Sequence, residues 1–479
     1  MRLKLPLLCF GTLTIVALAV PIYFLNKEVH LKNKSNTAAE LISQGNYALA
    51  HDLLIQSETN PDSLTSKQSV IKHIQLALCE QALNRPQKAF EYLSNIPSNK
   101  IPEVNSYLKL WEAKALIDLE RYIDAERILQ QAIDSTNNPF ILEPTLTYLG
   151  QIYQKTERLN KAIEIYLTHI KKYTGDRSTT LWTLSKIYDA IGQSSRKRIC
   201  YIELIEQHKT TKEGLKAAIA IKGPLNVDER FLVAQTYFEH QKYSDAIRRL
   251  KKIVERNPDE KFVVDCHILL ARSFSGNGQN DQAIKHLKIA YKQYESPKAL
   301  YMIAGILVKQ NQDKKAISAY KTFAQRYPKH ELADKALWQA AKAAERNGLF
   351  SESKSAYTLL IQNHPISNYY DDAKWGVGFS YFCLDSLSLA LNTFTDLSKS
   401  STEPHIIDQS LYWAGKTAIR LNLNEEAESF YSKAALGFPR SYYSAKAVKM
   451  GFGHTAQLNY SIVADHKLIR SEDIDRSET

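Results

Sequence analysis

The sequence predicts an all-α fold, an α-α superhelix of stacked helix pairs that follows one N-terminal transmembrane helix. One helical pattern recurs along residues 36–453, and the 479-residue chain contains only 17 Gly and 15 Pro. So few turn residues favour helices with short connectors over a large β protein. Residues 5–25 form an uncharged apolar run of 21 residues, which is long enough to cross a bilayer as a helix.

Residues 1–26 are expected to form a signal-anchor. Ala17 and Ala19 give the small-x-small form of a cleavage site, so a secreted or periplasmic body cleaved near Ala19 is an alternative. Apolar residues continue past Ala19 to Leu25, which favours an uncleaved anchor. Basic residues flank both sides of the span, so the positive-inside rule does not decide orientation. The short basic head favours an inner-membrane, single-pass protein with a periplasmic body, and a cytoplasmic body stays open.

The rest of the chain divides into five predicted segments. One of them, 208–229, lacks the aromatic residues of its neighbours and contains the helix-stopping pair Gly223-Pro224. The segments are a linker (27–35), an N-terminal array (36–207), a degenerate repeat or hinge (208–229), a C-terminal array (230–453) and a polar tail (454–479).

The repeat is clearest in the second helix of each pair, where an alanine recurs. Neighbouring alanines are separated by 36, 37, 37, 33 and 37 residues, and two wider gaps of 84 and 74 residues each leave room for one more pair. Weaker copies at 196–205 and 351–360 fill the gaps, the latter with Ser353 in the alanine position. The alanines are Ala89, Ala125, Ala162, Ala246, Ala283, Ala316, Ala390 and Ala427.

The recurring pattern has a direct physical reading. A small residue lets two antiparallel helices approach and makes room for a large side chain across the pair, while apolar residues at i+3 or i+4 and i+7 complete the buried stripe. The preceding helices carry the matching small and aromatic residues, as in LGQIY (149–153) and WAGKTAIRL (413–421). Prolines such as Pro328 and Pro365 follow the second helices, where the chain must leave the helix.

This pattern resembles the tetratricopeptide repeat (TPR), a helix pair that stacks into a solenoid with a concave surface for peptides or helices. The proline joints at 326–341, 363–378 and 437–451 are similar to those of bacterial envelope proteins, including TPR proteins of the Tol-Pal system and of outer-membrane assembly. They also resemble the superhelical domain of soluble lytic transglycosylases. The residues that carry this likeness are Tyr412, Trp413, Ala414, Pro439, Tyr442 and Tyr443.

The resemblance does not extend to a catalytic site. A lytic transglycosylase uses a Glu general acid, usually followed by Ser, but Glu352-Ser353 and Glu428-Ser429 lie within repeat helices and no companion motif follows them. A general acid also needs a desolvating pocket, which an exposed helix face does not provide. Phosphate-loop, dinucleotide and metal-ligand motifs are absent from the sequence. We therefore predict no enzyme, no catalytic, cofactor-binding or metal-binding residue and no cofactor.

Charge gives the remaining indication of function. The chain carries a net charge of +11, and residues 151–330 contain 33 Lys and Arg against 18 Asp and Glu. Such an excess attracts acidic protein segments or anionic lipid headgroups. Neither a nucleic acid nor a small-molecule substrate is expected.

The sequence thus predicts a membrane-anchored scaffold for protein–protein interactions in the bacterial cell envelope. The alternative is a peptidoglycan-associated relative of the lytic transglycosylases, either non-catalytic or completed by a separate catalytic chain. Several aromatic residues at the ends of units could anchor a partner, but packing within the array is the favoured role. These are Tyr237, Tyr243, Trp338, Tyr369, Tyr370 and Trp375.

Overall fold

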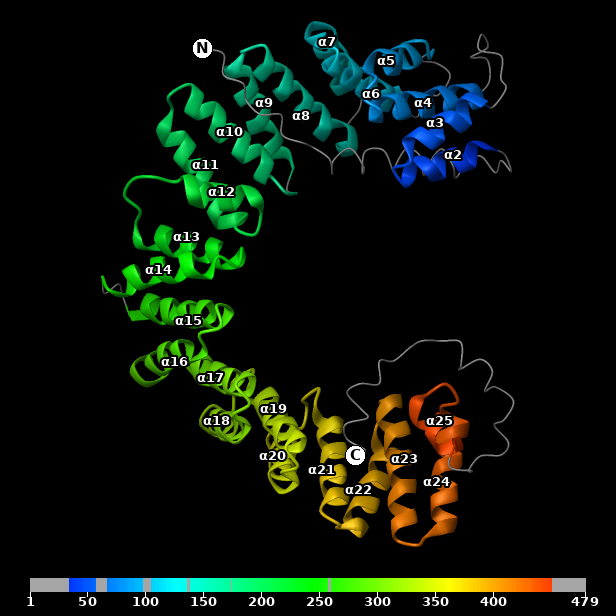
Figure 1. Ribbon diagram of the computed structural model, residues 1–479, viewed down its shortest axis with the longest axis vertical. Helices are drawn as coiled ribbons and strands as arrows, with labels where there is room; N and C mark the ends of the chain where they lie inside the picture. The colour runs from blue at the N-terminus through cyan, green and yellow to red at the C-terminus, as the bar shows by residue number, and fades with distance from the viewer. Residues whose placement is uncertain are drawn as a thin grey trace. The chain divides into compact units, whose positions relative to one another are not determined.

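The computed structural model describes residues 34–56, 67–97, 105–135, 138–173, 175–256 and 260–449. Within these ranges the chain forms 24 helices, α2 to α25, and no strand (Figure 1). The predicted all-α fold is confirmed. The predicted membrane span and polar tail lie outside these ranges, and among the helices described none is long and apolar enough to cross a membrane.

The described helices fall into two compact units, which divide between Gly223 and Pro224. The first unit contains the pairs α2 (Lys34–Ser43) with α3 (Tyr47–Gln56), α4 (Lys67–Ala82) with α5 (Pro86–Ser94), α6 (Asn105–Asp118) with α7 (Tyr122–Ser135), α8 (Pro139–Lys155) with α9 (Leu159–Lys172), and α10 (Ser178–Ala190) with α11 (Ser194–Gln207), followed by the single helix α12 (Lys212–Ala220).

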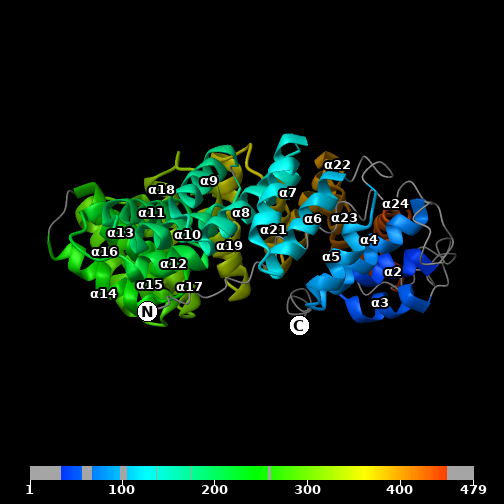
Figure 2. The same ribbon diagram turned by 90° about the horizontal axis from the view of Figure 1, so that it is seen from above.

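The second unit has the same build. Its pairs are α13 (Val227–Glu239) with α14 (Tyr243–Val254), α15 (Glu260–Gly276) with α16 (Asn280–Tyr294), α17 (Pro297–Lys309) with α18 (Asp313–Arg326), α19 (Ala333–Arg346) with α20 (Phe350–Asn363), α21 (Tyr370–Cys383) with α22 (Leu387–Ser400), and α23 (Pro404–Arg420) with α24 (Asn424–Gly437), followed by the single helix α25 (Tyr442–Lys449). Helices α22 to α24 lie side by side in both views (Figures 1 and 2).

A left-handed residue forms the turn within every pair. It stands two positions before the second helix and has a φ between 56° and 80°, as at Asn311 and Gly348. The next residue donates its backbone N–H to the carbonyl five positions earlier, as Gln312 does to Leu307 at 2.9 Å. This is the Schellman arrangement, which satisfies the last carbonyls of the first helix. Each pair is therefore closed by the same local geometry.

The aligned alanines form the centre of each pair, as predicted. All eight are fully buried, and so is Ser353 in the weaker copy that fills the second gap. The first gap holds α10 and α11, where the half-buried Lys197 stands in the alanine position and donates to Asp189. Both weak copies are therefore true helix pairs. The copy at 351–360 buries its small residue, Ser353, as the strong copies bury their alanines.

Small residues on the first helices receive aromatic rings from the second helices. A Cβ atom added to Gly150 would lie 2.4 Å from the ring of Tyr166, and one added to Gly376 would lie 2.2 Å from the ring of Tyr357. Gly415 meets Tyr431 in the same way, at 2.8 Å. These ring-to-glycine contacts explain why glycine and aromatic residues recur together in the sequence.

A single helix follows the last pair of each unit. Helix α12, inside the stretch 208–229, packs on α10 and α11, and α25 packs on α23 and α24. Tyr443 of α25 lies 5.3 Å from Tyr412 between ring centroids and 5.2 Å from Tyr442. Residues 438–447, with the sequence FPRSYYSAKA, therefore cover the end of the last pair.

Candidate functional site

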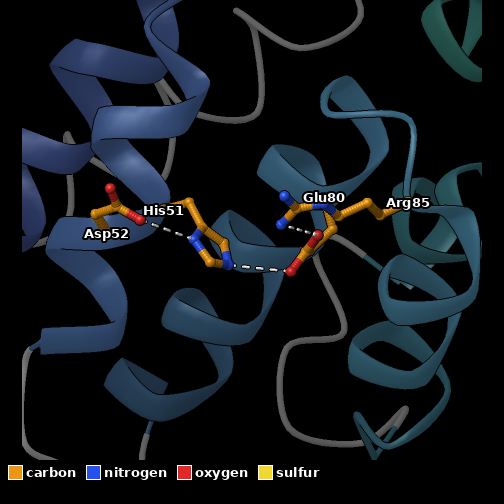
Figure 3. Close-up of polar contacts among 4 residues, drawn as sticks. All are labelled: His51, Asp52, Glu80 and Arg85. Atoms are coloured by element: carbon orange, nitrogen blue, oxygen red, sulfur yellow. Dashed lines mark hydrogen bonds and ion pairs between the residues drawn. The ribbon is translucent and has the colours of Figure 1, made fainter.

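One polar cluster in the first unit joins three consecutive elements (Figure 3). Glu80 on α4 is 1% exposed, and its carboxylate accepts from His51 Nε2 of α3 at 3.0 Å. Arg85, in the turn before α5, approaches the other carboxylate oxygen at 3.5 Å, while Asp52 lies 3.4 Å from His51 Nδ1. A buried carboxylate is costly unless it is paired, so these contacts stabilise α3 against α4.

Asp52, His51 and Glu80 form a row of carboxylate, imidazole and carboxylate, as in some catalytic sites, but these residues include no nucleophile. The neighbouring thiol of Cys79 is fully buried, and burial raises its pKa to about 12. A protonated thiol is a poor nucleophile. The cluster is therefore a structural connection between the first two pairs.

A histidine pair joins α15 and α16 in the second unit. His267 is 4% exposed, and its Nδ1 lies 2.9 Å from Nδ1 of His286. Burial, together with the charges of His267, Lys251 and Lys285, lowers the pKa of His286 to about 4. When both imidazoles are neutral, the Nδ1–H of one ring can donate to Nδ1 of the other. The sequence offered no sign of this pair, because its partners are 19 residues apart on different helices.

A shallow groove runs along α16, and we call it the lysine groove. Its volume is about 710 Å³, and it is open to solvent along its length. Ile303 and Leu307 of α17 form a buried floor, at 7% and 9% exposure. Its rim carries exposed lysines from α16 and from the start of α18, namely Lys285, Lys288, Lys292 and Lys315.

The groove continues into a second hollow beside the turn between α15 and α16. Asp281 and Gln310 line both hollows, and the Gln310 amide donates to Asp281 at 2.9 Å between them. Beyond this contact, the Lys251 ammonium lies 5.5 Å from the ring centroid of Phe274. The groove along α16 is thus an apolar trough with a basic rim, the second hollow has a mainly polar lining, and Asp281 lines both.

The two glutamates weighed as general acids from the sequence lie on separate helices, α20 and α24. Glu352 and Glu428 are both exposed on their helices, so neither has the desolvating pocket that a general acid requires. Cys200 and Cys266 are buried, and burial raises their pKa to about 11 and about 12. Among the residues described, no group of three His, Cys, Asp or Glu side chains could hold a metal ion.

The aromatic residues considered as partner anchors pack within the array. Trp338 stacks on Tyr369 with ring centroids 5.1 Å apart, and Trp375 stacks on Phe379 at 5.2 Å. Tyr237 is 5% exposed and accepts at its hydroxyl from Arg249. Tyr243 fills the space beside Gly276, and Tyr370 is half-buried beneath Lys374. The predicted packing role is confirmed for these side chains.

Comparison with known proteins places the groove within a defined repeat segment. Residues 268–331 match the tetratricopeptide repeat family model, whereas no curated protein sequence matches the chain. Among solved structures, PilF of Pseudomonas aeruginosa is 13% identical with a TM-score of 0.31, over 50% of this chain and 99% of that chain.

PilW, a widely conserved type IV pilus biogenesis factor, is 14% identical with a TM-score of 0.30, over 47% of this chain and 100% of that chain. The TPR domain of P58(IPK) is 15% identical with a TM-score of 0.24, over 81% of this chain and 97% of that chain. These scores are too low to define a shared overall geometry. Residues 268–331 are thus similar to the tetratricopeptide repeat, and the helix pairs on either side of them have the same build.

Proposed function

We propose that the chain is a membrane-anchored scaffold that holds a protein partner on its helical array in the bacterial cell envelope. The observation that carries the proposal is the lysine groove, which lies wholly within the matched repeat segment 268–331. Stacked repeats of this kind create extended binding surfaces. A hollow with an apolar floor and a polar rim has the composition of a protein-binding surface.

The anchor in this proposal is the apolar run of residues 5–25. Its length suits a single bilayer crossing, and the short basic head favours a periplasmic position for the array. The regional excess of lysine and arginine over residues 151–330 would then face partners with acidic surfaces.

Fractionation of cells that produce the full-length chain tests the anchor. We expect the chain to remain in membranes after alkaline carbonate extraction, and a variant with Ile15→Lys and Leu18→Lys to lose this retention. A reporter fused after Thr479 that is active only outside the cytoplasm should be active. Release of the unaltered chain by carbonate, or reporter activity restricted to the cytoplasm, would contradict the corresponding part of the proposal.

The scaffold role is tested by cross-linking in intact cells followed by purification of the full-length chain. We expect a cross-linked protein to be recovered in near-stoichiometric amount, and we expect its recovery to depend on the helical array. The purified chain should release no fragments from cell walls. Release of anhydro-muropeptides from isolated cell walls would instead support the peptidoglycan-active alternative. Recovery of no cross-linked protein would contradict the scaffold role itself.

A further inference from the structure

We propose that the lysine groove binds an acidic amphipathic helix of a partner protein. Carboxylates of this helix would face Lys285, Lys288 and Lys292, and its aliphatic side chains would cover Ile303 and Leu307. The proposal rests on the scaffold function and names the chemistry of the partner segment.

The first argument is an unbalanced charge. Residues 280–315 contain seven lysines and three acidic residues. Each acidic residue already has a partner, as Asp281 bonds to Gln310, Asp313 accepts from Asn347, and Glu295 lies 3.7 Å from Arg326. In contrast, the described residues place no carboxylate within ion-pairing distance of the three rim lysines of α16. Their charge is therefore available to a partner.

The second argument is the spacing of the lysines. Lys285, Lys288 and Lys292 are separated by three and four residues on one exposed face of α16. With a rise of about 1.5 Å per residue, they stand roughly 4.5 Å and 6 Å apart along the helix axis. Carboxylates at positions i, i+3 and i+7 of a second helix have the same spacing, so a helix aligned with α16 can face all three lysines.

The third argument is the apolar floor. Ile303 and Leu307 of α17 lie beside the half-buried Ile284 and Ile289 of α16. Such a trough accepts the apolar stripe of an amphipathic helix, with anchors at helical spacing. A flat anionic bilayer can reach the lysines of the rim but not the floor between the helices. The geometry therefore favours a protein segment over a membrane surface.

Asp281 sets the limit of the acidic stretch. Its carboxylate lies four residues before Lys285 on α16 and lines the groove together with Gln310. A partner carboxylate at this point would be repelled, because like charges in contact are destabilising. We therefore infer that the acidic stretch of the partner faces residues 285–292 and that a neutral or basic residue faces Asp281.

Peptide binding to the full-length chain in detergent tests the proposal. The probe is a fluorescein-labelled synthetic 16-residue helix with glutamates at i, i+3 and i+7 beside a leucine stripe, and binding is followed by anisotropy. The triple variant Lys285→Glu, Lys288→Glu, Lys292→Glu should bind at least about tenfold more weakly. A control triple variant with the same charge change at exposed positions outside the groove, Lys298→Glu, Lys329→Glu and Lys399→Glu, should stay within about twofold.

Two further measurements separate charge from shape. A probe with glutamine in place of glutamate should bind equally well to the two triple variants. Ile289→Gln, which keeps all the lysines, should weaken binding of the original probe. Circular dichroism checks that each variant is folded, which is expected because the substituted lysines are exposed.

Equal binding of the peptide probe by the two triple variants would overturn the proposal. It would also be overturned if the groove variant bound the peptide normally and lost only its binding to vesicles of neutral and anionic phospholipids. Failure of the probe while a cross-linked partner is still recovered would refute this inference but leave the scaffold function standing. Loss of both would refute the scaffold function as well.

Discussion

Replacement of Asp408 by asparagine is expected to stabilise the second unit at neutral and alkaline pH. Asp408 lies on α23 and is 3% exposed. Its Oδ1 has no hydrogen-bond partner among the described residues. Burial raises the pKa of Asp408 from 3.8 to about 6, although a hydrogen bond from Ser441 acts in the opposite direction.

In two earlier helix pairs, an aspartate at the position of Asp408 accepts a hydrogen bond from a serine. Asp334 and Asp371 precede Asp408 at intervals of 37 residues. They are half-buried and accept hydrogen bonds from Ser367 and Ser401, each at 2.6 Å. In the last pair the same carboxylate is more deeply buried, so its charge is less well solvated.

The magnitude follows from the pKa difference between the folded and unfolded chains. A rise of about two units corresponds to about 3 kcal/mol of unfavourable free energy for the ionised form in the folded state. The sign is that of a group whose pKa is raised by folding: its contribution to stability is fully present below about pH 4 and is lost as pH rises through about 6. Asparagine has the same shape and carries no charge at either pH.

Urea unfolding of the full-length chain at pH 8 and pH 4 measures this effect, and hydrogen exchange of α23 assigns it to the second unit. We expect Asp408→Asn to raise the free energy of unfolding by about 2–3 kcal/mol at pH 8 and to change it little at pH 4. Destabilisation at pH 8, or an equal gain at both pH values, would refute the reasoning.

Three other substitutions test packing and polar contacts elsewhere. Gly376→Ala should lower the free energy of unfolding by about 1–3 kcal/mol, because the added Cβ would lie 2.2 Å from the Tyr357 ring; unchanged urea stability would contradict this contact. The lowered pKa of His286, about 4, predicts a contribution to stability that is present above about pH 6.5 and is lost as pH falls through 4. His286→Gln should therefore flatten the pH dependence of the melting temperature over this range. An unchanged slope would argue against the histidine pair. His51→Ala leaves the buried Glu80 carboxylate less well paired, so it should lower the free energy of unfolding by about 1–3 kcal/mol in thermal unfolding. The exposed control Asp52→Asn should lower it by under about 0.5 kcal/mol. Equal effects of the two variants would contradict the role of the cluster.

The pairing of helices could be predicted from the sequence because it depends on contacts that repeat locally. The alanines and Ser353 mark positions where two helices approach, and every such residue is buried. The turn residue two positions before each second helix is a weaker signal, because Asn, Asp, Glu, Gln and Gly all occupy it. The turn backbone is common to the pairs, but its residue type is not.

The candidate site could not be predicted in the same way. The lysine groove depends on how α16, α17 and α18 pack, so residues such as Lys285 and Leu307 meet across elements whose relative positions no local pattern specifies. The regional excess of positive charge was visible in the sequence, but the groove that concentrates it was not. The 37-residue interval between Asp334, Asp371 and Asp408 was also visible and could have indicated their shared role.

The central claim is that this array holds a protein through the lysine groove, and cross-linking in intact cells tests it most directly. Cells would produce the full-length chain, the groove triple variant at residues 285, 288 and 292, or the control triple variant at 298, 329 and 399, at equal levels. We predict a cross-linked protein with an acidic helical segment whose recovery falls at least about tenfold with the groove variant and is unchanged with the control. Equal recovery with all three chains would contradict the claim.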